Sequence, residues 1–207
     1  MEKFDKLQAI AAPLMRQNID TDMVIRIERL RDLPRGKLGP YAFENARYKP
    51  DGSEAPEFIL NRPPYRDAKL ILAADNFGCG SSREAAVWAL WDYGIRCVIA
   101  PSFGPIFYNN CFQNGLLPVI LPLPVIEELV AEVEASQGTG QVSVDLEKCT
   151  VTSPSGKVTS FKLDEMRREA MLKGQDQIEQ TRTRDPQIAA FQKADQKRFP
   201  WLYAARQ

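Results

Sequence analysis

Residues 70–100, LILAADNFGCGSSREAAVWALWDYGIRCVIA, contain two apolar runs separated by a glycine-rich turn and a helix-forming segment. Residues 69–74 predict a buried strand, and residues 97–100 predict the next one. Between them, residues 82–93 predict a helix that ends at Gly94. Two strands joined by a helix at this spacing form a βαβ unit, in which the strands are parallel. The sequence therefore predicts an α/β fold.

The same alternation of strands and helices continues toward the C-terminus. The predicted elements are a helix over 105–114, a strand over 117–121, an amphipathic helix over 124–136, short antiparallel strands over 141–145, 149–152 and 157–162, and a helix over 164–173. A hairpin turn is expected at Pro154-Ser155-Gly156. The polar tail after Gln175 is expected to be helical around residues 186–197.

The first third of the chain has a weaker pattern. Residues 23–25, Met-Val-Ile, are strand-like, and the rest of this region is expected to be irregular. Residues 31–56 are rich in glycine, proline and charge, which is typical of a long loop or lid.

Composition excludes several classes of function. The chain has 207 residues, with 27 basic and 27 acidic side chains, so no overall charge favours nucleic acid or an anionic membrane. No apolar run approaches the roughly 20 residues of a membrane span. The N-terminal residues lack the apolar core of a signal peptide, so a cytoplasmic location is expected.

Histidine is absent, and the cysteines are widely spaced. Without histidine, the chain cannot form a Ser-His-Asp or Cys-His pair or supply an imidazole metal ligand. The four cysteines form no C-x-x-C pair, so no metal site made by this chain alone is expected. Cys97 lies in a predicted strand and is expected in the core, whereas Cys79 lies on the glycine-rich turn.

The glycine-rich turn predicts an anion site. It leads into Ser81, Ser82 and Arg83, so two hydroxyls, a guanidinium and the free N–H groups of a helix start face one point. Arg83 occupies the third glycine position of a dinucleotide fingerprint, and no Gly-Lys-Ser/Thr of a P-loop follows. Ser81 has an alternative interpretation, a capping box with Glu84. A cation in the first helical turn opposes the helix dipole, and an anionic ligand would offset that placement.

Four motifs together resemble a known family. GCGSSRE followed by Trp88-Ala89-Leu90 resembles the swivelling domain of the aconitase superfamily, and more closely the family of bacterial 3-isopropylmalate dehydratase small subunits. Residues 18–22 (NIDTD), 102–110 (SFGPIFYNN) and 114–118 (NGLLP) are similar to further segments of that family, in the same order.

The resemblance implies both a fold and a partner. It implies a three-layer β/β/α swivelling domain over residues 1–174, with a mixed, largely parallel central sheet and a small antiparallel extension. Residues 31–66 would form a substrate-side loop or lid, and residues 175–207 a helical tail that packs on the domain or on a partner. The partner would be a large catalytic subunit whose cysteines hold a 4Fe–4S cluster, so this chain alone would bind no cofactor. The substrate would be a small dicarboxylate.

The resemblance also implies roles for single residues. Ser81 would be the base that removes the proton next to a carboxylate, and Ser82 and Arg83 would bind carboxylate oxygens. An arginine of the substrate-choosing loop matches Arg35, with Arg31 as the second choice; the alternative is a solvated basic loop. Residues expected to support the site are Gly78, Cys79, Gly80, Asp20 and Asp22, the two aspartates by bonding backbone amides of their turn.

The chain departs from the family motif at two positions. The motif runs S-S-R-E-H-A-P-W, whereas this chain has Ala85 in place of the histidine and Val87 in place of the proline. The resemblance implies isomerisation of 2- and 3-isopropylmalate by dehydration and rehydration in leucine biosynthesis. The departures leave open a dehydratase for another methylated malate, of dimethylmalate or citramalate type, and a non-catalytic, anion-binding regulatory subunit.

Overall fold

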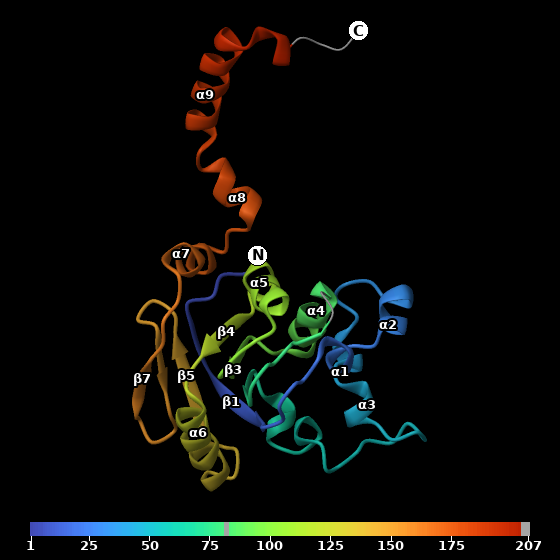
Figure 1. The fold of residues 1–207 in the computed structure, drawn as a ribbon. Helices are drawn as coiled ribbons and strands as arrows, with labels where there is room; N and C mark the ends of the chain where they lie inside the picture. The colour runs from blue at the N-terminus through green and yellow to red at the C-terminus, as the bar shows by residue number, and fades with distance from the viewer. Residues whose placement is uncertain (81–82, 204–207) are drawn as a thin grey trace. The chain divides into compact units, whose positions relative to one another are not determined.

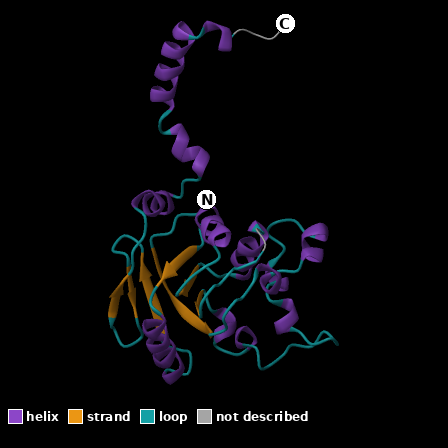
Figure 2. Cartoon of the chain, viewed as in Figure 1, coloured by secondary structure: helices purple, strands orange, loops and turns teal. Residues whose placement is uncertain are grey.

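The computed structural model describes residues 1–80 and 83–203, drawn in Figures 1 and 2. The chain divides into two compact units, residues 1–174 and residues 175–207. Within the described residues, no helix has both the length and the apolar content needed to cross a membrane.

The first unit is built on a seven-stranded mixed sheet with strand order β4-β3-β2-β1-β5-β6-β7. β1 to β4 are parallel to one another, and β5 to β7 extend the sheet by antiparallel pairing from β1. The predicted mixed sheet with its antiparallel extension is confirmed. The strands are β1 (Lys6–Leu14), β2 (Leu70–Ala73), β3 (Cys97–Ala100), β4 (Leu117–Ile120), β5 (Gln141–Asp145), β6 (Thr150–Thr152) and β7 (Val158–Ser160).

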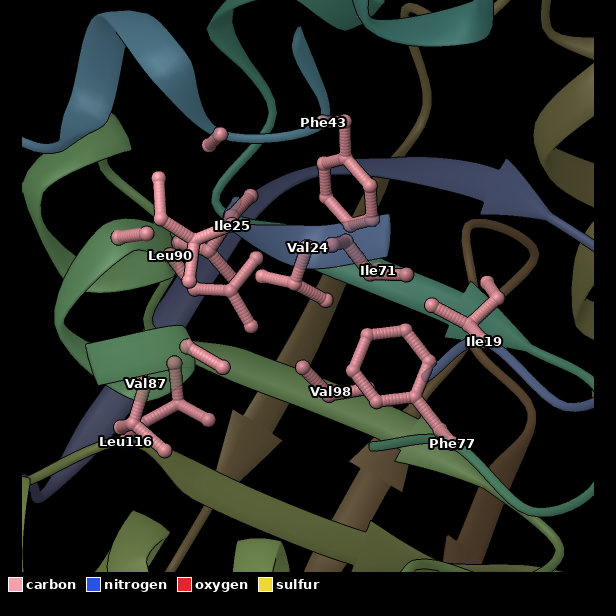
Figure 3. Close-up of a cluster of buried hydrophobic side chains, with 14 of the residues drawn as sticks. Ile19, Val24, Ile25, Phe43, Ile71, Phe77, Val87, Leu90, Val98 and Leu116 are labelled. Carbon is pink, nitrogen blue, oxygen red and sulfur yellow. The ribbon is translucent and has the colours of Figure 1, made fainter. Parts of the chain in front are cut away.

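Both faces of the parallel strands are buried. In β2, Leu70 and Leu72 belong to one apolar cluster, while Ile71 and Ala73 belong to the other. This alternation follows from the two-residue period of a strand, and burial on both faces explains the continuous apolar runs. α4 (Glu84–Tyr93) packs in the cluster shown in Figure 3, and α6 (Leu123–Ala135) packs in the opposite one.

The elements predicted after residue 69 are confirmed, with small shifts at their ends. α5 (Pro105–Asn114) ends at Gly115, and α7 (Glu165–Lys173) begins after an Asp164 cap and ends at Gly174. The two last strands are shorter than expected. The predicted start of the α4 helix at Ser82 lies outside the described residues.

The first third of the chain differs from the prediction. β1 is a nine-residue strand between β2 and β5, so the expectation of an irregular opening is wrong. Residues 23–25 do not form the expected strand, because the Asp20 carboxylate accepts the Met23 N–H at 2.7 Å and begins the short helix α1 (Thr21–Val24). The segment continues through α2 (Ile27–Asp32), η1 (Gly39–Tyr41), α3 (Glu44–Arg47), η2 (Ile59–Asn61) and η3 (Tyr65–Asp67).

The second unit consists of α8 (Gln177–Arg182), α9 (Asp185–Arg198) and η4 (Pro200–Leu202). The helix predicted around residues 186–197 is therefore confirmed. α8 begins with a capping box between Asp176 and Glu179.

Candidate active site

Three segments meet where parallel strands end. They follow β1, β2 and β3, and they contain the NIDTD, GCGSSRE and SFGPIFYNN motifs. The Gly78 N–H donates to the Ile19 carbonyl at 2.7 Å, and the Phe77 N–H donates to the Ser102 carbonyl at 3.1 Å. Open α/β sheets bind ligands at the carboxyl edge of their strands. The fold therefore brings together three of the motifs on which the resemblance depends.

Two glycines allow this close approach of the backbone. A Cβ on Gly78 would lie 2.2 Å from Cγ of Phe107, and the residue has a φ of +72°. A Cβ on Gly104 would lie 2.3 Å from the carbonyl oxygen of Gly78. Larger residues at either position would force the segments apart. Cys79, next to Gly78, is half-buried, and its carbonyl accepts the Thr21 N–H at 3.0 Å.

Arg83 is the N-cap residue of α4. Its side chain is 20% exposed and forms an ion pair with Asp22. The guanidinium therefore lies beside the free N–H groups of the helix start, and its charge is balanced by a carboxylate of the same chain. At the predicted anion site, the Arg83 guanidinium is thus paired with an anionic side chain of this chain, the Asp22 carboxylate.

The capping box considered as an alternative for Ser81 requires Glu84 as the third residue of the helix, and this expectation is wrong. Glu84 is the first residue of α4 rather than the third, and its carboxylate accepts from Nδ2 of Asn114 at 2.8 Å. The predicted base Ser81 and its neighbour Ser82 lie outside the described residues. Gly80, which precedes them, has a φ of +87°.

The two aspartates of the NIDTD motif have different partners. Asp20 bonds a backbone amide of its turn, as predicted. Asp22 was expected to do the same, but its carboxylate pairs with Arg83 instead. A cavity of about 280 Å³ lies beside these residues, and its lining also includes Met23 and Phe43.

The structure connects Arg35 to α4. The Arg35 guanidinium lies 5.4 Å from the centre of the Trp88 ring, which α4 carries. The backbone after Arg35 is bound to the same helix through Asp92. Arg31 lies exposed on α2, and no contact to α4 is described for it. Of the two predicted arginines, Arg35 is therefore the one placed on the helix that Arg83 begins.

Three residues organise this region: Trp88, Asp92 and Asn114, which link α4 to the Arg35 loop and to α5. Sequence reasoning identified Asn114 as helix-end scaffolding, but it gave Trp88 no role, although this residue lies within a motif, and it missed Asp92. Asp92 looks like an ordinary polar residue near a helix end, and nothing in its neighbours indicates a distant partner.

The residues that depart from the family motif are buried. Ala85 is 7% exposed and belongs to the apolar cluster under α4, and Val87 is fully buried in the same cluster. The position at which the family motif has histidine is thus an apolar packing position in this chain.

The cysteines do not form a metal site within the described part of the chain. That part contains no group of three or more histidine, cysteine, aspartate or glutamate side chains that could hold a metal ion. Cys97 and Cys111 are fully buried, and burial raises the pKa of both thiols. The predicted core position of Cys97 is confirmed.

Comparisons with known proteins agree with the motifs. A model of the aconitase C-terminal domain matches residues 1–124, and a model described as LeuD_N matches residues 127–165. The chain is 49% identical to a 3-isopropylmalate dehydratase small subunit of Gluconacetobacter diazotrophicus, over 97% of both chains. It is 48% identical to a protein of the same name from Paramagnetospirillum magneticum, over 98% of this chain and 100% of the relative.

A solved structure supports the fold independently. The crystal structure of a 3-isopropylmalate dehydratase from Methanocaldococcus jannaschii matches with a TM-score of 0.64, at 24% identity, over 89% of this chain and 98% of that one. At that identity the match concerns the fold. The near full-length relatives and the family model show that the chain belongs to the family of 3-isopropylmalate dehydratase small subunits, built on the aconitase C-terminal domain.

Proposed function

We propose that this chain, paired with a large subunit, forms a cytoplasmic hydro-lyase that interconverts 2-isopropylmalate and 3-isopropylmalate in leucine biosynthesis. Its near full-length similarity to proteins named as small subunits of that enzyme supports the proposal. The structural observation that carries it is the position of Arg83, which caps α4 where the motif segments meet. A guanidinium beside a helix start suits a carboxylate-bearing substrate.

In this proposal, Arg83 binds a substrate carboxylate. Arginine presents two parallel N–H donors to a carboxylate, and the helix N-terminus adds favourable partial charge. The Asp22 carboxylate pairs with Arg83, so the substrate must share the guanidinium or replace Asp22 there. Ser82 would supply a further donor to the carboxylate.

Ser81 would remove the proton from the carbon next to the carboxylate, and would return it in the reverse reaction. A serine acts as a base only where its alkoxide is stabilised. The guanidinium of Arg83, two residues later in the chain, and the free N–H groups at the start of α4 are the stabilising groups that this chain offers.

The remaining chemistry belongs to the partner. A 4Fe–4S cluster in the large subunit would act as the Lewis acid that binds the substrate hydroxyl. Cys97 and Cys111 are buried in the core of this chain and serve packing, and the cluster ligands would come from the large subunit. This chain would contribute the carboxylate-binding and proton-transfer half of the site.

The proposal is tested by reconstituting the chain with its large subunit and assaying 2-isopropylmalate. Ser81→Ala is expected to lower kcat by roughly 10²- to 10⁴-fold, as removal of a general base does. Arg83→Lys is expected to lower kcat/KM by roughly 10- to 100-fold, because the two-donor contact is lost. Arg66→Lys is the matched control, since Arg66 lies just before β2, at the opposite edge of the sheet, and pairs with Glu54.

Parallel assays on dimethylmalate and citramalate test the substrate. Turnover of one of these without turnover of isopropylmalate would overturn the assignment in favour of a related dehydratase. Full activity of a complex containing Ser81→Ala would indicate a binding or regulatory subunit instead.

A further inference from the structure

The loop that carries Arg35 is fixed to α4 by one carboxylate. Oδ2 of Asp92 accepts the Gly36 N–H at 2.8 Å and the Leu38 N–H at 3.0 Å. The loop also lies directly on the helix end, because a Cβ on Gly39 would be 2.4 Å from the Asp92 carbonyl oxygen. Leu38 is 1% exposed, so this part of the loop is packed as well as hydrogen-bonded. Asp92 therefore sets where the backbone after Arg35 lies.

The ring under the Arg35 guanidinium is fixed too. Nε1 of Trp88 donates to Oδ1 of Asn114 at 3.0 Å, and Nδ2 of Asn114 donates to the Glu84 carboxylate at 2.8 Å. Asn114 is 3% exposed, so these bonds are shielded from water. The ring is thus bound to α5 and, through Asn114, to the first residue of its own helix.

Both arginines are therefore positioned by α4. Arg83 caps the helix, and Arg35 lies over the ring of Trp88 five positions later, which is roughly 7–8 Å along the axis and about 140° around it. Among the described residues, Asp22 pairs with Arg83, whereas no carboxylate is described as an ion-pair partner of Arg35. α4 thus holds two guanidiniums in fixed places, and no carboxylate partner is described for that of Arg35. Such a pair suits a ligand with two carboxylates.

Arg31 lacks this support. It lies on α2, a six-residue helix that contributes no buried residue. We propose that Asp92 is a positioning residue that holds Arg35 over Trp88, so that Arg35 binds the second carboxylate of the substrate bound by Arg83. This inference rests on the proposed function.

The test uses the reconstituted complex and its 2-isopropylmalate assay. Asp92→Ala is expected to raise KM by roughly 10-fold or more and to change kcat little, because a binding contact is weakened without loss of the base. Asp92→Asn is expected to recover most of the KM, since an amide oxygen accepts the same two N–H groups. Asp51→Ala, which removes an exposed aspartate that accepts the Ser53 N–H at 2.9 Å in another loop, is the matched control and is expected to keep the wild-type KM.

A double-mutant cycle separates positioning from general destabilisation. Arg35→Ala is expected to raise KM as Asp92→Ala does, and the double variant is expected to be no worse than Arg35→Ala alone. If Asp92→Ala fails to fold, Trp88→Leu replaces it in the cycle and is expected to be equally non-additive with Arg35→Ala. Additive effects, or an unchanged KM in the Asp92 variant, would overturn the inference. A wild-type complex inactive on isopropylmalate, dimethylmalate and citramalate would instead overturn the proposed function.

Discussion

Two regions of the first unit are stabilised in different ways. Residues 70–120 contain three of the parallel strands and two helices, and their buried side chains are mostly apolar. Residues 15–68 contain short helical segments between β1 and β2, and their buried side chains include Glu44, Arg47 and Asn61. Figure 3 shows that both regions contribute to one apolar cluster, in which Ile25 and Phe43 lie near Ile71 and Leu90.

Buried polar side chains replace regular hydrogen bonding in the second region. The Arg47 guanidinium donates to Oδ1 of Asn61 at 3.2 Å and to the Pro40 carbonyl at 3.3 Å. Nδ2 of Asn61 donates to the carbonyls of Arg47 and Ala55, at 2.6 and 2.9 Å. Three of these four bonds end on backbone carbonyls, and the fourth joins the two side chains to each other. A segment beside a site can therefore be held in place without repetitive structure.

The largest expected effect comes from the regular region. Leu72→Ala, in a fully buried position of β2, is expected to lower the free energy of unfolding by about 3–4 kcal/mol, because it removes apolar contacts and leaves a cavity. Urea unfolding of the full chain measures this. Ile120→Ala on β4, where the side chain is 45% exposed, is the matched control and is expected to cost under about 1 kcal/mol. Equal losses in both variants would contradict the importance assigned to burial.

A local effect is expected from the irregular region. Arg47→Met leaves the Asn61 amide and the backbone carbonyls that Arg47 binds without donors, which is expected to cost about 2–3 kcal/mol. Hydrogen exchange is expected to show lost protection at the Ala55 and Asn61 amides, with β2 and β3 still protected. The control is Arg62→Met, because Arg62 also bonds carbonyls but is exposed. Equal loss of protection throughout the sheet would show that the two regions are not separable.

The sequence predicted the regular region because its pattern is local. The continuous apolar run of β2, the Gly94 and Gly115 helix ends and the Asp164 cap all depend on neighbours in the chain. β1 was missed because this strand carries polar residues and a proline, and because its partners, β2 and β5, lie far away in the sequence. The helix at Thr21 was missed because one side-chain cap outweighs a strand-like composition.

The candidate site was predictable in its residues more than in their partners. The motifs identified Arg83 and Asp22, but only the fold shows that they pair. The choice between Arg31 and Arg35 likewise depends on Asp92, which follows Arg35 by 57 positions, and no local pattern connects the two. The interpretation of residues 31–66 as a substrate-side lid stays a prediction.

The smallest expected effect uses pH to separate the two regions. Cys97 and Cys111 both lie in the regular region, and burial raises the pKa of each thiol in the folded state. Their stabilising effect is complete below the unfolded-state pKa of about 8.5 and is lost as the pH rises above it. Titration of each thiol in the unfolded state is expected to lower the free energy of unfolding by about 1 kcal/mol between about pH 8 and 9.5, because the full slope of about 1.4 kcal/mol per pH unit is reached only well above that pKa.

Urea unfolding between about pH 8 and 9.5 measures this loss and compares the wild type with a Cys97→Ala, Cys111→Ala double variant. The double variant is expected to be less stable at every pH but to lose less stability as the pH rises. Val98→Ala is the control, because it removes buried apolar volume from β3 without removing a titratable group. Cys97 lies in β3 and Cys111 in α5, so local opening at Asn61 is expected to expose neither thiol, and the additional effect of Arg47→Met is expected to be the same at both ends of the range. If the free energy of unfolding falls with pH as steeply in the double variant as in the wild type, the buried thiols do not cause the loss of stability at high pH.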